Sequence, residues 1–126
     1  MELFELIPIE QDGSIKRSAV LPQVAIDFCK NLKEAYELRG FVPPWIGYLA
    51  FLDLECVGSC AFQGAPEGSA IEISYLTFSE HAKKGIATRM TRALLEIARQ
   101  AGPGQMLKAL TLPQEAGITH LRRASA

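Results

Sequence analysis

The chain has 126 residues, of which 48% are hydrophobic and 21% are charged, with a formal net charge of −1. This length favours one domain over residues 1–126, and the hydrophobic content excludes a disordered chain. Because the charges nearly cancel and form no concentrated basic face, the composition argues against nucleic-acid binding.

The three cysteines are Cys29, Cys56 and Cys60, an odd number in a chain that is long enough to fold without crosslinks. This count predicts reduced thiols and a cytoplasmic location. A spacing of four residues puts Cys56 and Cys60 on the same side of a strand, and no second Cys/His pair has ligand spacing, so we expect no bound metal. No signal-peptide pattern opens the chain, and the longest apolar window, residues 45–54, is too short to span a bilayer.

The N-terminal third predicts one strand and one helix. Residues 3–9 alternate loosely in polarity and stop at a turn signal, which is typical of a strand. Pro22 suits a first helical position, and the apolar residues behind it recur at helical spacing. We expect Gly40 to end this helix in a left-handed conformation.

The central part of the chain predicts three strands. Two of them, residues 45–52 and 56–62, are joined by a hairpin turn at 53–55. A loop that contains Gly and Pro, residues 64–69, leads to the third strand at 70–78.

The C-terminal part begins with the most strongly periodic segment, residues 86–101, where one face is apolar and the other is charged, as in an amphipathic helix. Gly and Pro residues end this helix. A short apolar run at 107–112 and a last helical segment at 114–123 complete the expected elements.

The turn into the helix at 86–101 has the sequence Lys83-Lys84-Gly85-Ile86-Ala87-Thr88. Such a turn directs several unpaired backbone N–H groups at one point, where the helix dipole also favours negative charge. These features predict a cradle for a pyrophosphate. The carboxylate of Glu72 lies on the strand that leads to it, which suggests an enzyme that holds a phosphorylated cofactor and removes a proton beside it.

The run from Glu72 to Thr88 resembles the acetyl-coenzyme A binding motif of GNAT N-acetyltransferases, and the order of the predicted elements is similar to that of the family. The resemblance implies an α/β (α+β) fold with a mixed, mostly antiparallel sheet, helices on both faces and no counterpart of the last two strands. It departs from the family at Ala82, where a long polar side chain is expected. Missing strands would leave an unpaired sheet edge, so we expect a homodimer or a higher oligomer.

The resemblance also implies roles for individual residues. Glu72 would act as general base for an amine that attacks acetyl-coenzyme A directly. Backbone groups of Leu76, Thr77 and Phe78 would pair with the pantetheine arm, while the amides of residues 84–88 would hold the diphosphate. The implied cofactor residues are Leu76, Thr77, Phe78, Lys83, Lys84, Gly85, Ile86, Ala87 and Thr88.

Several alternatives stay open at this point. Glu72 is either the base or an ordinary charged residue at a sheet opening. Tyr75 either touches the acyl group or packs in the core, and Trp45 either lines the acceptor pocket or is a structural aromatic. The acceptor would be a small-molecule or peptide amine. The rival interpretation is a non-catalytic module that binds coenzyme A or only dimerises.

Overall fold

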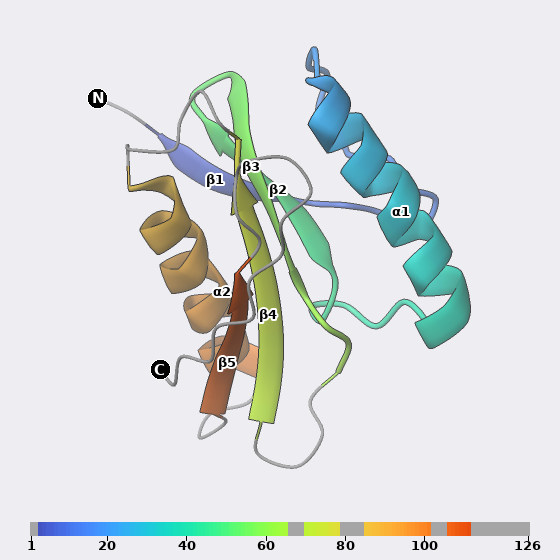
Figure 1. Ribbon diagram of the computed structural model, residues 1–126, viewed down its shortest axis with the longest axis vertical. Helices are drawn as coiled ribbons and strands as arrows, with labels where there is room; N and C mark the ends of the chain where they lie inside the picture. Colours follow the sequence, from blue (N-terminus) through green and yellow to red (C-terminus); the bar gives the residue numbers. More distant parts are fainter. Residues whose placement is uncertain (1–2, 66–69, 79–84, 102–105, 112–126) are drawn as a thin grey trace.

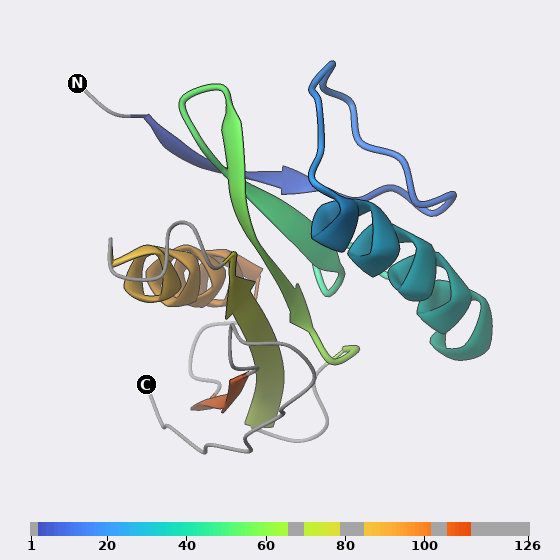
Figure 2. The ribbon, with the colours of Figure 1, turned by 45° about the horizontal axis from the view of Figure 1, so that its top comes forward.

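A computed structural model describes residues 3–65, 70–78, 85–101 and 106–111, in which helices on opposite faces cover a five-stranded sheet (Figures 1 and 2). The strands lie side by side in sequence order, and only the last pair is parallel. This arrangement confirms the predicted fold class. The strands are β1 (Phe4–Pro8), β2 (Gly47–Leu52), β3 (Glu55–Phe62), β4 (Ala70–Thr77) and β5 (Met106–Thr111).

Helix α1 (Gln23–Arg39) is fixed against the β2 side of the sheet at two points. Leu32 packs so closely that a Cβ on Gly47 would lie 2.0 Å from its Cδ2 atom, which explains the glycine there. The buried Tyr36 hydroxyl donates to the Ile9 carbonyl at 2.9 Å and accepts the Gly47 N–H at 3.0 Å. The helix is therefore tied to the end of β1 and to the start of β2.

Two predicted boundaries need correction in this half of the chain. β2 begins at Gly47 rather than at Trp45, because the Trp45 N–H bonds to the Val42 carbonyl at 2.9 Å and closes a turn. Gly40 does end α1, but with φ 95° and ψ 166° its backbone is extended at positive φ instead of left-handed helical. The predicted hairpin turn is confirmed, with Asp53 at φ 55°.

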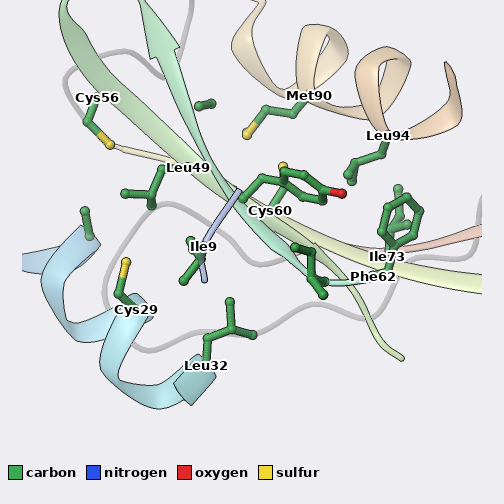
Figure 3. Packing of buried hydrophobic residues seen from close by; sticks show 14 of the residues in the cluster. Ile9, Cys29, Leu32, Leu49, Cys56, Cys60, Phe62, Ile73, Met90 and Leu94 are labelled. Atoms are coloured by element: carbon green, nitrogen blue, oxygen red, sulfur yellow. The ribbon is translucent and has the colours of Figure 1, made fainter. Parts of the chain in front are cut away.

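Helix α2 (Ile86–Ala101) has the bounds that the periodicity predicts. Its buried residues Ile86, Met90, Leu94 and Ala98 face the sheet, and a Cβ on Gly58 of β3 would lie 3.0 Å from the Met90 side chain. Figure 3 shows Met90 and Leu94 reaching down from α2 while Cys29 and Leu32 reach from α1 on the other side of the sheet. In the part of the chain that is described, neither helix is long and apolar enough to cross a membrane.

The prediction that Cys56 and Cys60 share one side of a strand is wrong. The β2–β3 register shifts by one residue after Ala50, so Cys60 lies opposite Tyr48 whereas Cys56 lies opposite Phe51. Tyr48 and Phe51 are three positions apart and therefore face opposite sides of the sheet. Cys60 lies on the α2 side and Cys56 on the α1 side. The predicted helix at 114–123 lies outside the described residues.

Candidate functional site

Strand β4 has two chemically different faces. Thr77 lies opposite Gly58, which meets Met90, so Thr77 is on the α2 side. Since side chains alternate along a strand, Ile73 and Tyr75 share that side, and the even-numbered residues lie on the other. Glu72 and Ser74 therefore face away from α2. In both views α1 lies over the β2 side of the sheet and does not cover this part of β4 (Figures 1 and 2).

The carboxyl end of β4 extends past its parallel partner. The pairing with β5 runs from Ala70 to Tyr75, and Figure 1 shows β5 ending partway along β4. Glu72 and Phe78 direct their backbone hydrogen bonds toward β3, with N···O distances of 2.8 and 3.0 Å. Because these directions alternate along an antiparallel strand, Leu76 also bonds toward β3, whereas the N–H and C=O of Thr77 point toward the β5 side. Of the three residues predicted to pair with pantetheine, Thr77 thus has its backbone groups directed to the β5 side, past the last described residue of β5.

The start of α2 provides a group of backbone donors that have no partner within the helix. Gly85 has φ 70°, a value that favours glycine, and its carbonyl accepts the Arg89 N–H at 3.1 Å as the helix begins. The N–H groups of Ile86, Ala87 and Thr88 are in the first turn and have no helical partner. The first turn contains no acidic residue. These donors fit a diphosphate. Lys83 and Lys84, like Ala82, lie outside the described residues.

Glu72 belongs to a polar cluster on the face of β4 that points away from α2. Its side chain is exposed, and its carbonyl accepts the Gln63 N–H at 2.8 Å. The Gln63 Nε2 atom donates to Ser74 Oγ at 2.7 Å, and Ser74 is only 8% exposed. We call Gln63, Glu72 and Ser74 the polar cluster. Sequence reasoning missed Gln63 and Ser74, although the two-residue spacing between Glu72 and Ser74 could have indicated the second.

The structure does not bring the two predicted acceptor aromatics together with Glu72. Trp45 is half-buried and packs edge-to-face against Phe62, with ring centroids 5.0 Å apart. Phe62 lies opposite Ile73 and therefore on the α2 side of the sheet. Tyr75 is half-buried on that same side. Contact of either ring with an acceptor stays a prediction.

The buried thiols are poor nucleophiles. Burial raises the pKa of Cys56 to about 12, and it raises the pKa of Cys29 and of Cys60 as well. Since the thiolate is the reactive form, these residues do not suit the role of an acyl carrier. Among the described residues, no group of three His, Cys, Asp or Glu side chains is placed to hold a metal ion.

Comparison with known proteins agrees with this arrangement. A family model described as acetyltransferase (GNAT) family matches residues 17–117, which is well over half of the chain. The match includes the polar cluster, the carboxyl end of β4 and the start of α2. A search of curated proteins finds no match.

Proposed function

Because the chain belongs to the acetyltransferase (GNAT) family, we propose that it transfers the acetyl group of acetyl-coenzyme A to an amine. The proposal is supported by two features of the described residues: the backbone of Thr77 points toward the β5 side past the end of β5, and the first-turn N–H groups of α2, which have no partner within the helix, begin after Gly85. Acetyl-coenzyme A needs both, because its pantetheine amides bond to a strand edge and its diphosphate requires several donors.

Different residues of the chain then bind the cofactor and accept the proton. Residues 84–88 hold the diphosphate with backbone N–H groups, and Thr77 offers one donor and one acceptor to the pantetheine arm. When bound, acetyl-coenzyme A supplies an activated acyl carbon for direct attack by nitrogen. Glu72 accepts the proton that the amine must lose to become a nucleophile. Its side chain is exposed, which leaves room for an acceptor to approach.

Calorimetry tests the binding half of the proposal. Gly85→Ala forces a side chain into a positive-φ position, which costs about 1–2 kcal/mol and displaces the first N–H groups of α2. We expect the Kd for acetyl-coenzyme A to rise at least about tenfold, since two or more charge-assisted hydrogen bonds are disturbed.

Gly40→Ala is the matched control. Gly40 has φ 95° and, like Gly85, no atom within 4 Å of an added Cβ, but it lies at the end of α1. With ψ 166° its backbone lies in a region that is essentially restricted to glycine, so the substitution costs at least as much backbone strain as Gly85→Ala, yet it should leave the Kd within twofold. Equal Kd values for both variants and the wild type would contradict a diphosphate site at α2.

Turnover measurements test the second part of the proposal, the transfer of the acetyl group to an amine. Thiol release from acetyl-coenzyme A is measured with primary amines of different size, namely Nα-acetyl-lysine, phenethylamine and spermidine. Release that depends on the amine supports the transferase. Binding of acetyl-coenzyme A without release for any amine would support the rival function, a non-catalytic module that binds coenzyme A.

The expected homodimer is a separate proposal. In the described part of the chain, β1 and β5 form the two edges of the sheet, and sheet edges are frequent sites of pairing between copies. Multi-angle light scattering should give twice the mass of the chain. A mass of one chain at micromolar concentration would contradict it.

A further inference from the structure

The segment between β1 and α1 folds back against α1 and encloses an open hollow of about 320 Å³ (Figure 2). An isolated bridge between Ile9 and Ile15 closes this segment on itself. Its turn packs on the helix, because a Cβ on Gly13 would lie 3.2 Å from the Cys29 carbonyl oxygen and 3.4 Å from Lys33 Cβ. The hollow is therefore built by α1 and the turn before it, and its lining includes no residue of the polar cluster or of α2.

One part of the lining is apolar. Ile15, Leu21 and Ile26 contribute to it, together with the buried Cys29. Ile26 is a large hydrophobic residue of α1, yet it is 45% exposed. The volume of the hollow lies at the lower end of the range of small-molecule pockets. Covering these side chains with an apolar group removes them from water, which favours the binding of an apolar ligand.

Two lysines also line the hollow. Lys30 and Lys33 are three positions apart on α1, so they share one face of the helix, and both are exposed. In the ranges that the structure describes, neither lysine makes a salt bridge. The acidic residue among the described lining residues is Asp12, whose Oδ1 accepts the Ser14 N–H at 3.0 Å and the Ser14 hydroxyl at 2.6 Å. These bonds lower the pKa of Asp12, so its carboxyl stays ionised and the lining keeps one net positive charge.

We propose that this hollow binds a small aliphatic monoanion, such as a short-chain carboxylate. The aliphatic part packs against Ile15, Leu21 and Ile26, and the carboxylate pairs with Lys30 and Lys33. A single negative charge matches the net charge of the lining, whereas a neutral or cationic molecule of the same shape lacks this attraction. The site is independent of the proposed acetyl transfer, because none of the residues assigned to that reaction lines it.

The test uses butanoate, pentanoate and hexanoate as probes, with 1-hexanol and hexylamine as the neutral and cationic counterparts of hexanoate. Binding is followed by the ¹H–¹⁵N chemical shifts of the full chain. We expect shifts at residues 12–15 and 26–33 and a Kd for hexanoate of about 1–10 mM, which is ordinary for a ligand of this size. Each added CH₂ group should lower the Kd about two- to fourfold, because it buries more apolar area.

The lysines test the contribution of charge. Lys30→Gln and Lys33→Gln should each raise the Kd for hexanoate about 1.5- to 5-fold, as expected for an exposed ion pair. Lys16→Gln changes the net charge of the chain equally and is the matched control, because Lys16 is exposed and does not line the hollow. It should leave the Kd unchanged. Equal Kd values for the wild type and both variants of the lining would overturn the pairing of the carboxylate with the lysines.

Ile26→Glu tests the apolar part of the lining. It replaces an apolar side chain with a carboxylate that repels the ligand, so the Kd for hexanoate should rise at least about tenfold. Val24→Glu is the matched control, because Val24 is 41% exposed on the same helix and does not line the hollow. Its Kd should stay close to that of the wild type. Equal losses of affinity in Ile26→Glu and Val24→Glu would contradict a ligand site in the hollow.

Three further results would overturn the site. The first is the absence of any chemical-shift change at about 20 mM hexanoate. The second is the same Kd for butanoate and hexanoate, or for hexanoate and 1-hexanol, since either result would show that only one part of the lining takes part. The third is displacement of hexanoate by one equivalent of acetyl-coenzyme A, which would assign the binding to the cofactor site. A wild type that acetylates no amine but binds hexanoate as described overturns the transferase and leaves this site intact.

Discussion

The two faces of β4 show how one strand serves both the core and the chemistry. On the α2 side, Ile71 and Ile73 are 1% and 0% exposed and contribute to the hydrophobic core. On the other side, Glu72 is exposed and Gln63 bonds to Ser74. The difference arises because α2 packs on β3 and β4, whereas α1 packs on β3 and is fixed at the start of β2 by Leu32 and Tyr36. Glu72 and the Gln63–Ser74 pair thus lie on the face of β4 that α2 does not cover.

The largest expected effect comes from the polar face. Glu72→Gln keeps the shape of the side chain but removes its ability to accept a proton. We expect kcat to fall about 10²–10⁴-fold, the usual contribution of a general base. The Kd for acetyl-coenzyme A by calorimetry should change less than twofold.

Glu37→Gln, an exposed glutamate of α1, is the control and should leave kcat unchanged. A Glu72→Gln enzyme with kcat within threefold of the wild type would show that the carboxylate is only an exposed charge at a sheet opening.

A substitution in the core on the α2 side of the sheet should change the free energy of unfolding rather than kcat. Leu94 of α2 is fully buried, so Leu94→Ala removes packed methyl groups and should lower the free energy of unfolding by about 2–5 kcal/mol. Urea unfolding measures this. Leu54→Ala, in the hairpin turn and 90% exposed, should change it by less than about 0.5 kcal/mol. Similar losses in both variants would contradict the position of the core.

Most of the fold could be predicted because its signals are local. The helix at 86–101 has an uninterrupted apolar stripe, and its bounds agree with α2. Gly40 and the turn at Asp53 mark the ends of their elements through backbone conformations that few other residues adopt. These signals lie within a few residues of the boundary that they fix.

The features that sequence reasoning missed depend on pairing between distant segments. The opposite placement of Cys56 and Cys60 follows from one extra residue in the β2–β3 register, which no spacing in β3 itself reveals. Gln63 lies beside Glu72 only because β3 and β4 pair in that register. Trp45 lies in a turn, away from the face that carries Glu72, because its N–H bonds to Val42. The pairing register of the strands determines which residues meet at the candidate site. This register depends on contacts between distant segments, so local sequence patterns do not reveal it.

A smaller effect tests what fixes α1 at the start of β2. Tyr36→Phe removes the hydroxyl that bridges Ile9 and Gly47 and leaves a buried N–H and a buried carbonyl without this partner. We expect the free energy of unfolding to fall by about 1–3 kcal/mol in urea at neutral pH. A fall below 0.5 kcal/mol would mean that Leu32 alone fixes the helix.

The pH dependence of unfolding tests whether the Tyr36 hydroxyl causes the stability difference between the wild type and Tyr36→Phe. Burial raises the pKa of Tyr36 to about 12 in the folded protein, against about 10 in an unfolded chain. Above pH 10 the unfolded chain loses this proton first, so the folded state is destabilised as the pH rises. The stability gap between the wild type and Tyr36→Phe should therefore narrow between pH 10 and 12. A constant gap would contradict the role of the hydroxyl.

The smallest expected effect concerns Thr77, a polar residue on the otherwise apolar α2 side of β4. Thr77 is 1% exposed, and its Oγ1 has no hydrogen-bond partner among the described residues. Thr77→Val is nearly isosteric and removes the desolvation cost of that hydroxyl, so the free energy of unfolding should stay equal or rise by up to about 1 kcal/mol. Because the proposed contact to the pantetheine arm uses the backbone N–H and C=O, the Kd for acetyl-coenzyme A should stay within twofold. A loss of affinity of tenfold or more would instead assign the hydroxyl to the ligand, and the α2 side of β4 would then take part in binding as well as in packing.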